Sequence, residues 1–202
     1  MEKLDLTKKY LSYYKAKKSP ELLSFGLTNY LSILGKGDPN DKEFGEKVAT
    51  LYPLAYGVKA ICKSNGQAFI VPKLEGLWWI ESDIDYTEVP RSEWRWKLLI
   101  RMPDFADTDM LDNARETLIK KKKEGLFHEV NFESIEEGDC VQILHLGSFS
   151  DEEKSLEKIH EFMKKENLSW NGYHHEIYLS DFRKTAQEKL KTILRQPVKK
   201  SD

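Results

Sequence analysis

The residues best suited to chemistry lie in the stretch Tyr173–Asp181, where one acid stands among aromatic and histidine side chains. Strand-like alternation places His174, Glu176 and Tyr178 on one face and His175 on the other. Because burying an ionised carboxyl without a partner costs several kcal/mol, the position of Glu176 needs an explanation. Two interpretations stay open: Glu176 points to water from a half-exposed strand, or it faces a cavity as the single acid of a site.

A single acid beside aromatic rings supports two kinds of chemistry. A carboxyl whose pKa is raised by burial can act as general base on a water molecule. An ionised carboxylate can instead be the counter-ion of a cationic ligand, with the rings adding cation–π contacts. The chain has no Gly-x-Ser-x-Gly elbow, no P-loop and no dinucleotide-binding glycine pattern. His174 and His175 are adjacent and point to opposite faces, so we expect no metal site and no cofactor.

Composition restricts the possible partners. The 202 residues include 32 Lys+Arg and 34 Asp+Glu, a formal charge of -2, so nothing drives the chain electrostatically toward nucleic acid or an anionic membrane. Cys62 and Cys140 lack the spacing of a metal or redox motif, which suits a reducing compartment. The first 18 residues resemble neither a signal peptide nor a membrane span. We therefore expect a cytoplasmic protein without direct nucleic-acid or membrane partners.

Periodicity predicts the elements that must position the acid. Residues 1–20 are expected to form a packing arm with a short amphipathic helix. Helical spacing predicts helices over 41–63, where Pro53 could kink or split the helix, over 107–123, and from Ser150, whose capping box includes Glu153. Alternating or branched runs predict strands over the following segments: 29–34, 67–83 with a bend, 94–102, two strands around 136–138, 173–179 and 193–198.

The two halves of the chain resemble each other. Residues 30–41 align with 140–151, residues 97–103 align with 191–197, and the segment at Leu74 aligns with that at His175, which sets Glu75 opposite Glu176. We predict an α+β fold in which two pseudo-twofold strand-helix-strand-strand repeats, about 30–103 and 127–198, form one antiparallel saddle within a domain spanning 21–202. Helices would cover its outer side, and a ligand cleft would lie at the junction. Generic likeness of α+β units is the alternative.

Several motifs carry a family resemblance. The closing stretch 174–198, with its Glu-Ile-Tyr run and its final Pro-Val, and the stretch 138–163, with a strand, His-x-Gly and a helix, resemble the signatures of the GyrI-like small-molecule-binding family. Leu74–Trp79 and Arg95–Phe105 are similar to a stand-alone branch of that family. One departure is Phe182, where the family usually has proline. We expect this change to loosen the turn without touching the site.

The resemblance implies a set of site residues. Glu176 matches the acid of the family's ligand pocket, and aromatic walls are the family's other constant feature. Since neighbouring strand residues face opposite ways, only one tryptophan of the pair at 78 and 79 is expected to line the cleft. Trp94, Trp96 and Tyr86 are weaker wall candidates, and His145 is a candidate with an expected structural role. The candidate ligand-binding residues beside Glu176 are Trp78, Trp79, Tyr56, Phe105, Tyr173, Tyr178, Glu75 and His145.

Three functions follow from the resemblance. Members of the stand-alone branch resemble hydrolases that open the cyclopropane ring of DNA-alkylating natural products, which implies a role for Glu176 as general base and for the protein in genotoxin resistance. The alternative is a multidrug-binding module that sequesters hydrophobic aromatic or cationic compounds, with Glu176 as counter-ion. A third possibility is contact with a protein partner such as DNA gyrase.

Overall fold

The structure is a computed structural model that describes residues 2–84 and 86–201. Its helices are α1 (Leu6–Lys9), α2 (Leu11–Tyr14), α3 (Lys42–Ser64), α4 (Thr108–Lys120) and α5 (Glu153–Lys165), with short 3-10 turns at Arg91–Glu93, Phe127–Glu129, Phe149–Asp151 and Gln187–Lys189. Its strands are β1 (Leu4–Asp5), β2 (Glu21–Phe25), β3 (Thr28–Lys36), β4 (Phe69–Ile70), β5 (Leu74–Trp79), β6 (Arg95–Met102), β7 (Asn131–Ile135), β8 (Gly138–Leu146), β9 (Leu168–Trp170), β10 (His174–Tyr178) and β11 (Lys191–Lys200).

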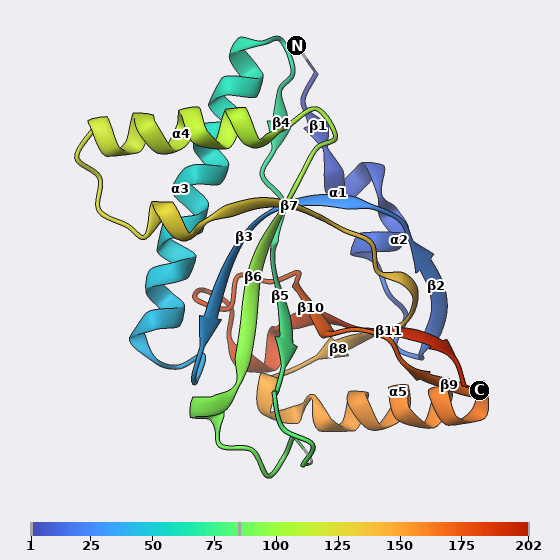
Figure 1. Ribbon diagram of the computed structural model, residues 1–202. Coiled ribbons are helices and arrows are strands. Elements are labelled where there is room, and N and C mark those ends of the chain that lie inside the picture. The colour runs from blue at the N-terminus through green and yellow to red at the C-terminus, as the bar shows by residue number, and fades with distance from the viewer. Residues whose placement is uncertain (1, 85, 202) are drawn as a thin grey trace.

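One large sheet of nine strands organises the molecule (Figure 1). Eight strands follow the order β2-β8-β11-β10-β5-β6-β3-β7, β9 pairs with β11, and every pair in this sheet is antiparallel. Helices α3 and α5 pack on one face, α4 packs against α3, and the arm that carries α1 and α2 lies on the other face. The predicted α+β class with an antiparallel sheet is confirmed.

The two ends of this strand order are joined by short connections. Strands β2 and β3 are separated only by residues 26–27, and β7 and β8 only by residues 136–137. Phe25 pairs with Gly138 and Thr28 pairs with Ile135, so a single register continues from β2–β8 into β3–β7. The first and last strands of the order must therefore meet, and the sheet curves strongly to allow it.

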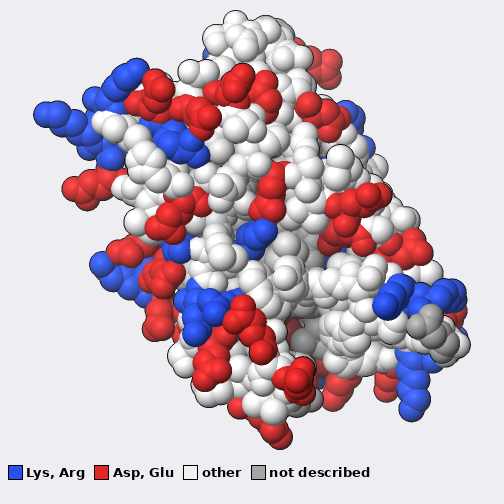
Figure 2. Space-filling model, in the orientation of Figure 1, with Lys and Arg blue, Asp and Glu red and all other residues white. Residues whose placement is uncertain are grey.

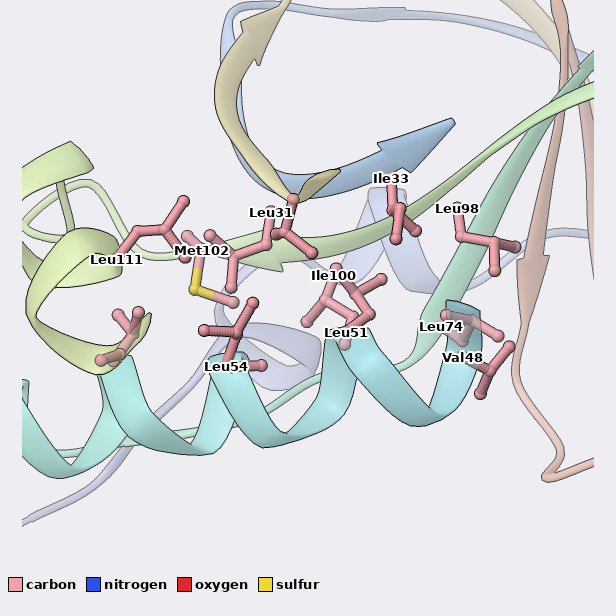
Figure 3. Packing of buried hydrophobic residues seen from close by; sticks show 14 of the residues in the cluster. Leu31, Ile33, Val48, Leu51, Leu54, Leu74, Leu98, Ile100, Met102 and Leu111 are labelled. Atoms are coloured by element: carbon pink, nitrogen blue, oxygen red, sulfur yellow. The ribbon is translucent and has the colours of Figure 1, made fainter. Parts of the chain in front are cut away.

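The main core lies between α3 and the strands β3 and β6 (Figure 3). Val48, Leu51 and Leu54 on α3 are buried at helical spacing against the sheet, and this continuous apolar face keeps the helix in one piece although it contains Pro53. Gly35 allows β3 to approach the next strand closely, because a Cβ there would lie 2.1 Å from the ring of Trp96. Trp96 is consequently a core residue with no exposed surface.

Three local features differ from the sequence predictions. Helix α5 begins after a 3-10 turn, and Ser150 bonds to Ser148 instead of capping the helix. Strands β1, β2 and β9 are additional to the predicted ones. Each is short, and each forms because a neighbouring strand pairs with it: β4 with β1, β8 with β2 and β11 with β9. The N-terminal arm contains two short helices in place of the single predicted helix.

The surface carries both signs of charge. On the face shown in Figure 2, acidic and basic side chains are interspersed, and a group of basic side chains lies over the outer end of α4.

None of the helices within residues 2–84 and 86–201 is both long enough and apolar enough to span a membrane.

Candidate functional site

The centre of the sheet is the pair β5–β10, whose register decides which side chains share a face. Glu176 pairs with Gly76, and His174 pairs with Trp78. Paired residues point to the same side of a sheet, so Trp78, Glu176 and Tyr178 all lie on the face covered by α3 and α5. The structure thus brings together the predicted acid, the predicted tyrosine and one of the two tryptophans.

A hydrogen bond connects two of these three residues. The indole Nε1 of Trp78 donates to the Tyr178 hydroxyl at 3.1 Å, and Glu176 lies two residues before Tyr178 on β10. His174 Nε2 lies 3.7 Å from Oε1 of Glu176, and burial lowers the pKa of His174 to about 4. The imidazole is therefore neutral at neutral pH and does not balance the charge of Glu176.

Aromatic rings from several segments pack on Tyr178 and Trp78, which share the sheet face of this acid. Phe149, in the turn before α5, packs edge-on against Tyr178 with ring centroids 5.8 Å apart. Phe182 packs against Tyr178 at 5.7 Å and against Phe149 at 6.1 Å. Phe44 of α3 stacks on Trp78 at 6.0 Å. We call the set Phe44, Trp78, Phe149, Tyr178 and Phe182 the aromatic cluster.

Glu176 is largely shielded from water. Its side chain is 12% exposed. Burial raises the pKa of Glu176 to about 7, although the neighbouring Tyr178 hydroxyl and the charge of His175 oppose this rise. A carboxyl with such a pKa exchanges its proton near neutral pH, which is the property of a general base and also of a counter-ion that can be switched off by acid.

A second carboxyl faces the same site. Glu152 is the residue that precedes α5, it is only 9% exposed, and burial together with the charge of Glu176 holds its pKa well above the ordinary value. His145 holds the turn before it, because its ring nitrogens bond to the Ser148 carbonyl and the Ser155 hydroxyl, both at 3.0 Å. His145 therefore supports the turn that carries Phe149 and Glu152.

Four predicted wall residues lie elsewhere. Trp79 and Tyr173 stack on each other at 4.3 Å on the opposite face of the sheet, beside a groove of about 380 Å³. Tyr56 is 55% exposed on the outer side of α3, because helical periodicity turns it away from the sheet. Phe105 packs on Phe69 below α4. These four residues do not contribute to the aromatic cluster.

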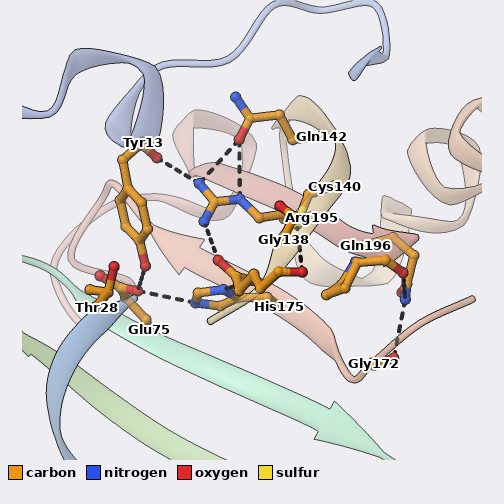
Figure 4. Close-up of polar contacts among 12 residues, drawn as sticks. Tyr13, Thr28, Glu75, Gly138, Cys140, Gln142, Gly172, His175, Arg195 and Gln196 are labelled. Atoms are coloured by element: carbon orange, nitrogen blue, oxygen red, sulfur yellow. Dashed lines mark hydrogen bonds and ion pairs between the residues drawn. The ribbon is translucent and has the colours of Figure 1, made fainter. Parts of the chain in front are cut away.

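Glu75 also lies on the opposite face, which corrects the predicted alignment. Glu75 pairs with Ile177, the residue after Glu176. Neighbouring strand residues point to opposite faces, so Glu75 and Glu176 lie on different faces of the sheet. The Glu75 carboxylate accepts a bond from the Tyr13 hydroxyl at 2.5 Å and lies 3.0 Å from His175 Nε2 (Figure 4). Glu75 is completely buried there.

Glu75 belongs to a buried charged cluster that extends across the sheet (Figure 4). His175 Nδ1 lies 2.8 Å from Glu137, and Arg195 Nη1 donates to the other oxygen of Glu137 at 2.7 Å. Arg195 also donates to the Gln142 side chain and to the Tyr13 carbonyl. The buried charged cluster is therefore Glu75, Glu137, Gln142, His175 and Arg195, closed by the arm through Tyr13.

Opposite charges set the ionisation of this cluster. Burial alone would lower the pKa of His175, but the charges of Glu137 and Glu75 and the hydrogen bonds to them raise it to about 9. Burial alone would raise the pKa of Glu137, but His175 and Arg195 lower it to about 2. His175 is thus a buried cation held between two carboxylates, and its role in this arrangement is structural.

The chain matches the model of the GyrI-like small molecule binding domain over residues 20–199. The chain belongs to the GyrI-like family. No curated protein matches it. Two solved structures from Listeria innocua are similar to this GyrI-like protein over 98% of its length and 100% of theirs. One is an uncharacterized conserved protein, 39% identical with a TM-score of 0.91. The other is a hydrolase, 38% identical with a TM-score of 0.89.

A more distant structure shares only the fold. The C-terminal domain of EcmrR is 12% identical, with a TM-score of 0.56 over 90% of this chain and 98% of that one. This likeness agrees with the curved antiparallel sheet of the GyrI-like protein and adds nothing about its ligands.

Four residues of the candidate site in this GyrI-like chain are not among the sequence-based candidates: Phe44, Phe149, Phe182 and Glu152. Phe182 is predicted to leave the site untouched, yet its ring packs on Tyr178 and Phe149 because the loop after β10 folds back over the sheet. Phe149 follows the His-x-Gly motif closely, which is a usable signal. Glu152 carries no signal, because an acid at the start of a helix is ordinary.

Gly76 offers a test of the site's geometry. A Cβ at this position would lie 2.9 Å from both Trp78 Nε1 and the Tyr178 hydroxyl, so Gly76→Ala must displace that hydrogen-bonded pair. We expect a loss of about 1–3 kcal/mol in unfolding free energy, typical of overpacking, and a change in tryptophan fluorescence. Gly26→Ala is the control, since nothing lies within 4 Å of its Cβ. Equal effects of the two substitutions would contradict the geometry.

The buried charged cluster predicts how stability depends on pH. The folded protein raises the pKa of His175 from 6.5 to about 9, so protonated His175 stabilises the fold. This contribution to the free energy of unfolding is complete below pH 6.5 and is lost as the pH rises through about 9. A shift of this size corresponds to on the order of 3 kcal/mol. Urea denaturation at a series of pH values should show this loss, and a His175→Gln variant should lack it. A wild-type free energy that stays constant between pH about 6 and 9 would be the contrary result.

Proposed function

We propose that this GyrI-like protein binds flat, hydrophobic aromatic compounds in the aromatic cluster and hydrolyses those that carry a cyclopropane ring. The observation that supports this most strongly is the shielded carboxyl of Glu176, whose pKa lies near 7 beneath aromatic rings. Stacking on such rings contributes on the order of 0.5–1.5 kcal/mol per aromatic pair beyond the burial of area. The similarity to a hydrolase at 38% identity over 98% of this chain agrees with a catalytic role.

The proposed reaction uses one water molecule and one carboxylate. Glu176 takes a proton from water while the water oxygen forms a bond to the cyclopropyl methylene carbon. The strained carbon–carbon bond breaks, and its electron pair moves into the adjoining dienone, which becomes a phenol after it takes up a proton. A base whose pKa is close to the working pH combines a substantial ionised fraction with useful basicity.

A non-catalytic binding function is the second candidate. Among the described residues, no Lys or Arg forms an ion pair with Glu176, and its neighbour His174 is neutral at neutral pH. An ionised Glu176 could therefore pair with a cationic ligand, and the surrounding rings would add cation–π attraction. In this case the protein would sequester aromatic cations without changing them.

Product formation separates the two functions. The wild-type protein is incubated with a large excess of an aromatic cyclopropyl dienone, and the ring-opened alcohol is quantified by mass spectrometry. Hydrolysis predicts many product molecules per protein molecule. Protection of only one equivalent, with no alcohol formed, would refute the catalytic proposal and support sequestration.

A further inference from the structure

Glu152 has an unused carboxyl group inside the proposed site. Its Oε1 atom is buried and has no hydrogen-bond partner among the described residues, and its side chain makes no capping bond to the start of α5. The residue is 9% exposed. An unpaired buried carboxylate would cost several kcal/mol, whereas a neutral carboxylic acid is tolerated far better.

The groups around Glu152 also favour the neutral acid. Glu176 and Tyr178 face it from β10, and both the charge of Glu176 and burial raise the pKa of Glu152. His174, beside Glu176, is neutral at neutral pH. From β8, His145 uses one ring nitrogen in a bond to the Ser148 carbonyl of the turn and the other in a bond to the Ser155 hydroxyl of α5, so it does not pair with the carboxyl. Oε1 of Glu152 therefore has no hydrogen-bond partner among the described residues.

We propose that Glu152 is the hydrogen-bond donor of this site and selects flat aromatic ligands that carry a carbonyl oxygen. The site then contains two carboxyl groups with different roles. Glu176 ionises near neutral pH and interacts with water or a cation, while Glu152 keeps its proton and presents it to an uncharged acceptor. In the hydrolysis proposed above, on which this assignment rests for its substrate class, that acceptor is the dienone oxygen.

Two ligands of nearly equal shape test this assignment. Fluorenone carries a carbonyl oxygen, and fluorene has a methylene group in its place. Equilibrium dialysis over a series of pH values gives the ratio of their affinities, and the donor is present wherever Glu152, whose pKa is raised by burial and by the charge of Glu176, keeps its proton. One hydrogen bond from Glu152 to the carbonyl oxygen should raise the ratio of fluorenone affinity to fluorene affinity. We expect this ratio to be roughly 2- to 10-fold higher in the wild type than in a variant that lacks the Glu152 carboxyl.

Two variants make the test decisive. Glu152→Met removes the donor and should abolish the extra preference for fluorenone while fluorene binding persists, which also shows that the variant folds. Glu152→Gln keeps a donor at every pH and should retain the preference at alkaline pH, where the wild type loses it as Glu152 ionises. An unchanged ratio in Glu152→Met would overturn the assignment.

The same variants separate this inference from the proposed hydrolysis. If the wild type forms no ring-opened product but shows the Glu152-dependent preference, hydrolysis fails and the donor role stands. If product forms but Glu152→Met keeps the wild-type ratio, hydrolysis stands and the donor role fails.

Discussion

Replacing Glu176 with Gln is expected to slow the turnover of a cyclopropane-bearing aromatic substrate by at least ~100-fold, the low end of what a general base contributes. Glutamine keeps the size and the acceptor oxygen of the side chain but cannot take a proton from water. Neutral aromatic ligands should still bind, since the aromatic cluster is unchanged. The measurement is the rate of alcohol formation under single-turnover conditions, together with the dissociation constant of an unreactive analogue.

The pH profile and a matched control complete this test. The wild-type rate should rise as the pH passes through about 7, because Glu176 must be ionised to act as base. Glu161→Gln removes an exposed acid from α5 and should leave the rate unchanged. Turnover in Glu176→Gln that remains within a few-fold of the wild type would exclude the general-base role.

Replacing Arg195 with Met should destabilise the protein by about 3–5 kcal/mol, the usual cost of breaking a buried ion pair by removing one partner. Arg195 has no exposed surface and bonds to Glu137, Gln142 and the backbone of Tyr13. Its loss leaves Glu137 with less compensating charge and releases one attachment of the N-terminal arm. Denaturant unfolding monitored by circular dichroism gives the free-energy change.

Two comparisons identify the cause of this loss. Arg183→Met removes an exposed ion pair with Asp181 and should cost less than about 1 kcal/mol. The double variant Arg195→Met with Glu137→Gln should be less destabilised than the sum of the single changes, because the two side chains interact directly. Additive effects would show that the charge pair is not the source.

The local sequence is sufficient to predict most elements and the strand that carries Glu176, the candidate acid. Alternation around Glu176 predicts the strand and its two faces, and helical spacing predicts α3, α4 and α5 to within a few residues. These features follow from short-range periodicity, which the sequence displays directly. The Glu-Ile-Tyr and His-x-Gly motifs also indicate the family, because each is a short run of residues that are contiguous in the chain.

The composition of the site depends on long-range register. A shift of one residue between β5 and β10 moves Glu75 from the predicted cleft to the opposite face, where it joins His175 and the arm. Sequence similarity between the halves constrains the register of two strands only loosely. A register shift of one residue nevertheless moves every side chain of the strand to the other face of the sheet. The same argument explains why Trp78, and not Trp79, meets Glu176.

The sequence by itself therefore determined the fold class, the family and the position of the central acid, because these rest on local patterns. Only the tertiary structure decided which rings pack beside Glu176 and that Glu152 lies near it. Phe44 comes from α3, Phe149 and Glu152 come from the turn before α5, and Phe182 comes from the loop after β10; these segments meet over the sheet after folding. Contacts between segments so far apart depend on how the whole sheet curves, and no local pattern encodes that curvature.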